Sequence, residues 1–127
     1  RYISQLTNEA KALEKDKNLS LFVQKFLKYL ELLNNFTLWL GEKNKTSKDD
    51  VSAACNDYLK VFGYIGLAHS WLKILKVSHD KIKENKSFYE DKINTATYYF
   101  DKILPRVQSH YLSAITGSET MMKSNFN

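Results

Sequence analysis

The chain has 127 residues, a formal net charge of +5, and 43% hydrophobic and 26% charged residues, a composition typical of one globular domain that argues against intrinsic disorder. Four glycines and one proline are too few for the many turns of a β-sandwich or β-barrel. The single cysteine, Cys55, excludes an intrachain disulfide and a cysteine-based zinc site. No run of roughly 18 apolar residues is present, so no membrane span is expected.

The kinds of basic residue indicate whether a nucleic-acid partner is expected, and the start of the chain indicates where the protein is located. Only two of the 19 basic residues are arginines, Arg1 and Arg106. Nucleic-acid readers favour arginine for its planar, bidentate guanidinium, so no nucleic-acid partner is expected. The chain begins at Arg1 without a methionine or a signal peptide, and we interpret it as a fragment of a longer polypeptide. The lone cysteine and the missing signal favour a cytoplasmic location.

Helical periodicity begins near the N-terminus. The first predicted helix is short, and its apolar face consists of Ile3, Leu6, Ala10 and Leu13. After a break at residues 16–18, a second helix is predicted from Leu19 to Leu40, because apolar residues recur there at i, i+3, i+4 and i+7. Gly41 is predicted to follow this helix as its C′ residue, where the backbone turns left-handed. Residues 41–47 are then expected to form a polar loop.

A third helix is predicted to begin after Thr46 or Ser47, since either is a good N-cap. Its predicted apolar stripe consists of Val51, Ala54, Cys55, Tyr58, Phe62, Ile65, His69, Leu72 and Leu75, with a continuation to His79 and Ile82. Gly63 and Gly66 lie in the middle of this helix, where each glycine costs about 1 kcal/mol relative to alanine. Two explanations are open: another helix approaches these small residues closely, or the helix has a mild kink.

A fourth helix is predicted from a capping box, with Ser87 as N-cap and Glu90 at N3. Its apolar stripe consists of Tyr89, Ile93, Ala96, Phe100, Ile103, Val107, Tyr111 and Ala114. Pro105 lies inside this helix and predicts a bend near residues 101–104, because proline lacks an N–H donor and clashes with the preceding turn. Gly117 is expected to end the helix.

Four amphipathic segments with short connections predict an all-α fold, an antiparallel up-and-down four-helix bundle. We assign residues 1–127 to this single domain, without an internal repeat or a linker.

No set of residues fits a catalytic or metal-binding template. None of His69, His79 and His110 follows a glutamate at the spacing of a di-iron bundle, and no Gly-rich phosphate loop or His-Glu-x-x-His motif is present. His69 lies on the apolar face, where a hydrogen-bonded core histidine is the ordinary case. Cys55 is expected to be buried and inert. We therefore predict no catalytic, cofactor-binding or metal-ligating residue, and a metal protein built on the three histidines ranks last among the hypotheses.

Two clusters of side chains have more than one interpretation. The densest basic cluster, which we call the lysine cluster, consists of Lys73, Lys76, Lys81, Lys83 and Lys86. It is either a solvated helix end that complements the helix dipole or a surface for an anionic partner. The adjacent aromatic residues 98–100 cannot all point the same way on a helix. Some of them are expected to contact a different neighbour.

An ordered set of short motifs in the second half of the chain resembles a known domain. The motifs are the run from Asp57 to Leu72, Ser87-Phe88-Tyr89 through Lys92, Thr95-Ala96, Tyr98-Tyr99-Phe100, Ile103-Leu104-Pro105 and Gly117. In order and spacing they resemble the C-terminal helical domain of a subset of acyl-CoA dehydrogenases. The chain departs from that family at Arg106, where an acidic residue is common.

The resemblance implies a cytoplasmic parent flavoenzyme that oxidises acyl-CoA to enoyl-CoA with FAD and passes electrons to an electron-transfer partner. The catalytic glutamate, the FAD site and the acyl pocket of that family belong to upstream domains, and none maps onto a residue of this chain. The resemblance thus implies a non-catalytic domain that packs on the catalytic domains of the same polypeptide and shapes a homo-oligomer. The alternative is a free-standing helical module that binds an anionic partner through the lysine cluster.

Overall fold

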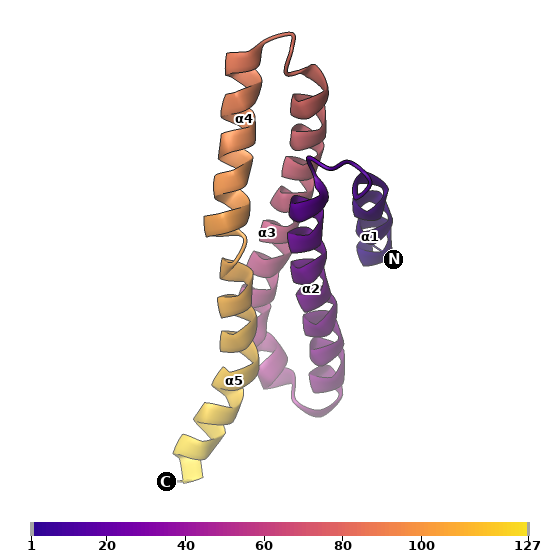
Figure 1. Ribbon diagram of the computed structural model, residues 1–127. Coiled ribbons are helices and arrows are strands. Elements are labelled where there is room, and N and C mark those ends of the chain that lie inside the picture. Colours follow the sequence, from indigo (N-terminus) through magenta and orange to yellow (C-terminus); the bar gives the residue numbers. More distant parts are fainter. Residues whose placement is uncertain (1, 127) are drawn as a thin grey trace.

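The computed structural model describes the backbone of residues 2–126 and the side chains of residues 2–116. The described elements are α1 (Tyr2–Leu13), α2 (Ser20–Thr46), α3 (Lys48–Lys81), α4 (Lys86–Tyr98), the π-helical turn η1 (Tyr99–Ile103) and α5 (Arg106–Phe126). Figure 1 shows α4 and α5 as successive parts of one interrupted helix. Together with α1, α2 and α3 it forms an antiparallel up-and-down bundle, which confirms the predicted fold class.

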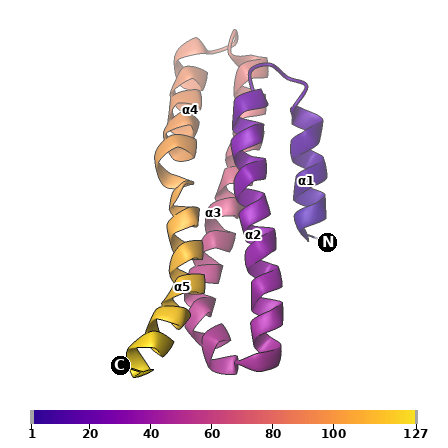
Figure 2. The same cartoon turned by 60° about the horizontal axis from the view of Figure 1, so that its bottom comes forward.

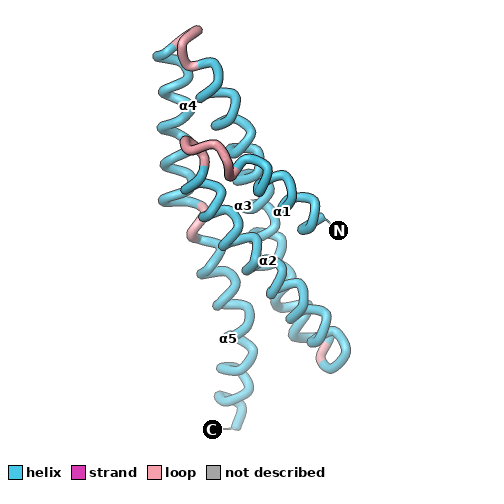
Figure 3. Tube along the Cα trace, turned by 45° about the vertical axis from the view of Figure 1, so that its right-hand side comes forward, coloured by secondary structure: helices cyan, strands magenta, loops and turns pink. Residues whose placement is uncertain are grey.

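α3 is the central helix of the bundle. It packs against α2, α4 and α5, whereas the short α1 packs mainly on α2. In Figure 1, α3 is the more distant helix, behind α2 and the interrupted helix. Figure 2 shows α1 alongside α2, away from α4 and α5. In Figure 3 the C-terminal part of α5 diverges from α2 and α3. No element of the described chain therefore covers the side of α3 that faces away from the core.

The core contains apolar side chains from all five α-helices and from η1. Phe26, Phe36 and Phe100 are its largest fully buried residues. The ring of Phe36, on α2, lies 5.1 Å from that of Tyr58 on α3 and 5.4 Å from that of Tyr111 on α5. Edge-to-face contacts of this kind add to the gain from burying the rings. Phe36 thus joins three helices at one point of the core.

The junction between α2 and α3 differs from the predicted loop. α2 continues through Gly41 to Thr46, and no described glycine has a positive φ. Ser47 alone separates the two helices: its N–H donates to the Lys43 carbonyl at 2.6 Å, and its hydroxyl accepts from the Asp50 N–H at 3.3 Å. The predicted C′ role of Gly41 and the loop at residues 41–47 are therefore wrong, while Ser47 is confirmed as an N-cap of α3.

Two predicted ends in the second half of the chain are also wrong. Asn85 caps α4, because its side-chain oxygen accepts from the Phe88 N–H at 3.2 Å. Ser87, the predicted cap, lies inside the first turn. The predicted helix end at Gly117 is also not observed, since α5 continues to Phe126.

The predicted bend in the fourth helix is confirmed. At η1 the Leu104 N–H donates to the Tyr99 carbonyl at 2.8 Å, an i→i+5 bond that widens the helix locally. Pro105 follows directly; its ring would clash with the carbonyl four residues earlier in a regular α-helix. The wider turn relieves this clash and separates α4 from α5 (Figure 1).

Candidate interaction surface

The outward face of α3 is the candidate functional surface. The inward face is buried against the bundle through Ala54, Val61, Ile65, Ala68, Leu72 and Leu75. The opposite face, which we call the α3 outer stripe, consists of Ser52, Asn56, Leu59, Gly63, Gly66, Leu67, Ser70, Ile74 and Val77. Steps of three and four residues place this set along one side of the helix. All of its members are exposed except Gly66, which is half-buried.

The α3 outer stripe contains no charged residue. Leu59 is 68% exposed, Leu67 55% and Val77 47%. A surface helix normally carries charged and polar residues on its outer face, and a helix that is apolar on both faces is normally buried. Clustered exposed apolar residues mark interaction surfaces more often than single ones do. The composition of the α3 outer stripe therefore indicates a face that another protein surface covers.

The two glycines of α3 lie on this outer stripe. A Cβ atom added at Gly63 or Gly66 would meet no neighbouring atom within 4 Å. The sequence left two explanations open for these glycines, close approach by another helix or a mild kink. No helix of this chain approaches them closely, so the first explanation is wrong within the chain. The small residues leave the α3 backbone accessible to something outside the described chain.

The rotation of α3 about its axis corrects two sequence expectations. Cys55, predicted to be buried, is exposed. Phe62 is 39% exposed, and Val61 takes the core position beside it. The ring of Phe62 instead stacks on that of Tyr2 from α1, with 5.1 Å between the ring centres. Because α3 is apolar on two faces, its hydrophobic periodicity alone did not identify the inward one.

Two of the three histidines, His69 and His110, pair with carboxylates on other helices. His69 Nε2 lies 2.7 Å from a Glu9 carboxylate oxygen, which ties α3 to α1. His110 Nδ1 lies 2.9 Å from an Asp57 oxygen, which ties α5 to α3. The His69 side chain is only 16% exposed and is paired with the Glu9 carboxylate, which agrees with its interpretation as a core histidine that has a polar partner. Among the described residues, no three His, Cys, Asp or Glu side chains lie close enough together to hold a metal ion.

Carboxylates neutralise part of the lysine cluster. The Lys76 ammonium lies 3.2 Å from an Asp16 oxygen and 3.3 Å from an Asp80 oxygen. These two carboxylates raise the pKa of Lys76. The pKa of Asp16 is lowered, chiefly because the Asn18 N–H donates to its carboxylate at 3.0 Å and secondarily by Lys76. Lys76 thus connects α3 to the α1–α2 loop rather than offering a free charge.

The other members of the lysine cluster are less constrained. Lys86 forms a long ion pair with Glu90 at 3.8 Å. Lys73, Lys81 and Lys83 form no ion pair with any side chain that the structure describes. The structure therefore leaves three ammonium groups near the end of α3 for an anionic partner.

The aromatic residues at the end of α4 point in different directions, as predicted. Tyr99 and Phe100 are buried, whereas Tyr98 is 59% exposed. The Tyr99 hydroxyl donates to the Tyr64 carbonyl at 2.6 Å. Burial of this hydroxyl raises the pKa of Tyr99. Tyr99 therefore fixes η1 to α3, and Tyr98 remains available at the surface.

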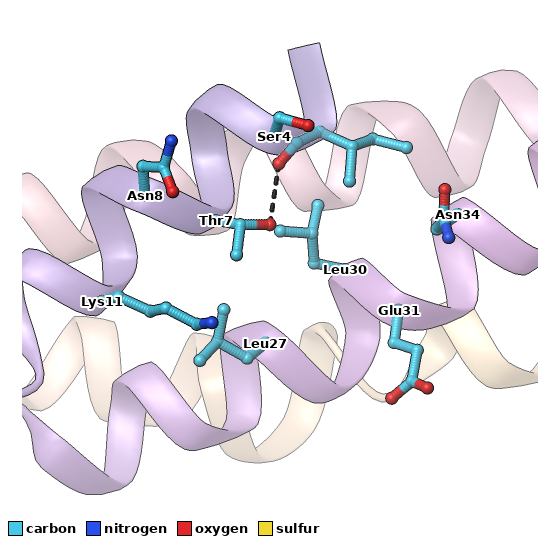
Figure 4. Close-up of a pocket in the computed structure, with 9 residues that line it drawn as sticks. Ser4, Thr7, Asn8, Lys11, Leu27, Leu30, Glu31 and Asn34 are labelled. Carbon is cyan, nitrogen blue, oxygen red and sulfur yellow. Dashed lines mark hydrogen bonds between the residues drawn. The ribbon is translucent and has the colours of Figure 1, made fainter. Parts of the chain in front are cut away.

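Two open grooves accompany these surfaces. One, of about 460 Å³, lies between α1 and α2. Figure 4 shows its lining, including Lys11 and Glu31 from opposite helices. The hydrogen bond drawn there joins the Thr7 hydroxyl to the Ile3 carbonyl of the same helix, at 2.8 Å.

The second groove, of about 380 Å³, lies between α3 and the start of α4. Its floor is apolar and includes Ile74, Val77 and Phe88, and Lys73 and Lys92 also line it. The Lys92 ammonium lies 5.3 Å from the centre of the Phe88 ring. Because Ile74 and Val77 belong to the α3 outer stripe, this groove extends that stripe onto α4.

Comparisons with known proteins give one family. A family model described as "Acetyl-CoA dehydrogenase C-terminal like" matches residues 3–125. No curated protein and no solved structure matches the chain. No described helix is both long enough and apolar enough to cross a membrane.

Proposed function

Because the chain belongs to the acetyl-CoA dehydrogenase C-terminal-like family, we propose that it is the non-catalytic packing and assembly domain of a longer FAD-dependent acyl-CoA dehydrogenase. The parent enzyme oxidises an acyl-CoA to its enoyl-CoA and passes the electrons to an electron-transfer partner. A cytoplasmic location and a homo-oligomeric state belong to the same proposal. The family match over residues 3–125 is the observation that carries it.

The distribution of side chains supports a structural role for this chain. His69, His110 and Lys76 are paired with carboxylates from other segments of the chain, and these pairs hold the bundle together. The uncharged α3 outer stripe is suited to packing against another protein surface. A packing domain requires ion pairs that hold its own helices together and an apolar face that another surface can cover, and this chain has both.

We place the FAD site outside this chain, and the lining of the two grooves described above is in keeping with this. Each groove is open, and neither is lined by a glycine-rich loop that would bring backbone N–H groups to a pyrophosphate. The proposal therefore assigns the flavin, and every chemical step, to other domains of the polypeptide.

Detection of the native polypeptide tests this proposal. An antibody raised against residues 86–116 is used to isolate the protein from its own cells. We expect a polypeptide several times heavier than 14.8 kDa that carries flavin absorbance and reduces an artificial electron acceptor when acyl-CoA is added. A protein of this chain's own mass without flavin would refute the proposal.

The unpaired lysines favour a second candidate function, binding of an anionic partner. Lys73, Lys81 and Lys83 would act together, and the affinity would fall steeply as salt is added. Binding of a polyanion such as heparin is measured at low and at high salt. Charge reversal at Lys81 should weaken binding more than charge reversal at Lys76, which is held by Asp16 and Asp80. Equal effects, or no binding, would remove this candidate.

A further inference from the structure

We propose that the groove between α3 and α4 binds a free amphiphilic carboxylate, an unbranched apolar chain that ends in one carboxylate group. The chain lies on the apolar floor of the groove, and the Lys92 ammonium and the Ser78 hydroxyl hold the carboxylate. This inference goes beyond the proposed assembly function, since it gives the domain a ligand site of its own.

The size and the floor of the groove suit an apolar chain. Its volume of about 380 Å³ lies within the range of roughly 300–1,000 Å³ that is usual for small-molecule sites. The antiparallel helices α3 and α4 pack against each other (Figure 1), so the groove is bounded along their axes. Its floor includes Val77, which is 47% exposed, and Phe88, which is 50% exposed. An apolar chain that covers these side chains is stabilised by their removal from water.

The charge of the lining favours an anion. The groove is lined by one lysine from each helix, Lys73 and Lys92, and none of its described lining residues is acidic. Neither lysine forms an ion pair with a carboxylate that the structure describes. Lys73 also borders a smaller pocket that contains Glu9, but the Glu9 carboxylate is paired with His69 at 2.7 Å. By contrast, the groove between α1 and α2 is lined by side chains of both charges and favours neither sign.

Ser78 supplies a hydroxyl on the wall opposite Lys92. It is the one buried polar residue in the described part of the chain, with 1% exposure, and it lines the groove. Its hydroxyl has no hydrogen bond to a described group, although no fully enclosed polar atom of the described side chains lacks a partner. The hydroxyl therefore opens onto the groove, where it can donate a hydrogen bond to a carboxylate oxygen.

The Lys92 ammonium and the Ser78 hydroxyl lie at the same end of the groove. Ser78 is three residues before the end of α3, and Phe88 is two residues after the start of α4. Since the helices are antiparallel and each residue advances about 1.5 Å, Ser78 and Phe88 lie at nearly the same height. The Lys92 ammonium is 5.3 Å from the centre of the Phe88 ring, so it belongs to the same end. A carboxylate placed there accepts hydrogen bonds from both groups, and its chain extends along Val77 toward Ile74.

Photoaffinity labelling of the native polypeptide tests the site in the whole protein. The probe is decanoate with a photoreactive diazirine in its chain, and the labelled protein is digested with trypsin. We expect label in residues 87–92, a tryptic peptide from the groove, and excess decanoate should reduce it at least about tenfold. The control peptide, residues 29–43, contains the exposed Leu38 and two glutamates and should show no such competition. Absence of label from residues 87–92 would show that another surface covers the groove, and it would overturn the proposal.

A series of ligands separates the contribution of the apolar chain from that of the carboxylate. The 127-residue chain is titrated after circular dichroism has verified that it is helical. Each CH₂ group added between hexanoate and decanoate should tighten binding about two- to fourfold. Decyltrimethylammonium has a chain of the same length and the opposite charge, and it should bind at least about tenfold more weakly than decanoate. Equal affinities for these two ligands would refute the site.

Matched variants locate the carboxylate and the chain. Lys92→Glu should weaken decanoate binding at least about tenfold, whereas Lys83→Glu, outside the groove lining, should change it less than about twofold. Val77→Asp should also weaken binding at least about tenfold, whereas Leu67→Asp, at an exposed position of α3 outside the lining, should not. Ser78→Ala should weaken binding about threefold or more. Equal effects within either pair, or an unchanged affinity of Ser78→Ala, would contradict the proposed position of the ligand.

Anionic vesicles distinguish a free ligand from a lipid surface. Vesicles of an anionic phospholipid should bind neither the chain nor its variants more tightly than neutral vesicles do. Binding to the anionic vesicles without binding of monomeric decanoate would assign the lysines to a membrane surface and overturn the proposal. None of these results bears on the mass or the flavin content of the native polypeptide, so this proposal and the proposed function fail separately.

Discussion

Replacement of Gly41 by alanine distinguishes two conformations with opposite effects on stability. Gly41 lies inside α2, five residues before its end at Thr46, and it does not have a positive φ. An added Cβ would touch no atom within 4 Å. Alanine is favoured over glycine in a helix by about 1 kcal/mol, and fraying near the helix end reduces this gain. We therefore expect Gly41→Ala to raise the free energy of unfolding by about 0.5–1 kcal/mol.

The alternative conformation predicts the opposite sign. Had Gly41 been the left-handed C′ residue that its place in the sequence predicts, alanine would cost about 1 kcal/mol or more. Urea unfolding followed by circular dichroism at low protein concentration separates these outcomes. For a chain of this size the expected gain corresponds to a rise of about 2–4 °C in the unfolding temperature. A decrease in either quantity would refute the observed continuation of α2 through Gly41.

Three further predictions follow from named contacts. Asn85→Ala should lower the free energy of unfolding by about 1 kcal/mol, because the Asn85 side chain caps α4. Ser87→Ala should change it by less than about 0.5 kcal/mol. Equal losses for the two variants in urea titrations would contradict the assignment of Asn85 as the cap. Phe36→Ala should cost about 3–5 kcal/mol, since Phe36 is fully buried between three helices, and a loss below about 1.5 kcal/mol in the same assay would show that the site is loosely packed. The pKa of Asp16 is lowered from its ordinary value of 3.8, so its contribution to stability is present above that pH and is lost as the pH falls through the lowered value. The Asp16→Asn variant should therefore lose less stability than the wild type between about pH 5 and pH 2, and parallel curves would argue against the contacts with Asn18 and Lys76.

The α3 outer stripe, the surface that we assign to assembly, is distinguished by its lack of charged residues. Most exposed helix faces in soluble proteins carry charges that keep them hydrated. The α3 outer stripe carries none between Asp49 and Lys81, although 26% of the chain is charged. This contrast, rather than any single residue, supports the packing role that we propose.

The sequence by itself determined the features that depend on local chemistry. Helical periodicity predicted the four segments and their alternating directions, and Pro105 predicted the bend that the structure realises as η1. Thr46 or Ser47 was predicted as a cap because either hydroxyl suits a helix start, and the structure selects Ser47. The motifs from Asp57 onward pointed to the family, to which the chain belongs. The helical segments, the bend and the cap depend on neighbours within a few residues along the chain, whereas the family resemblance depends on the order and spacing of motifs from Asp57 to Gly117.

Only the tertiary structure decided which face of α3 is buried and where α2 ends. Two faces of α3 are apolar, so periodicity left the choice open until α2, α4 and α5 packed on the side of Val61 and Ala68. That choice exposed Cys55 and Phe62 and placed both glycines of α3 on the outside. At Gly41 the local preference for a turn gave way to the helix, since Ser47 ends α2 and caps α3 at the same residue. The free energy gained by packing a whole helix exceeds the conformational preference of one residue. The buried face of α3 and the end of α2 are therefore determined by contacts between helices and not by the local sequence.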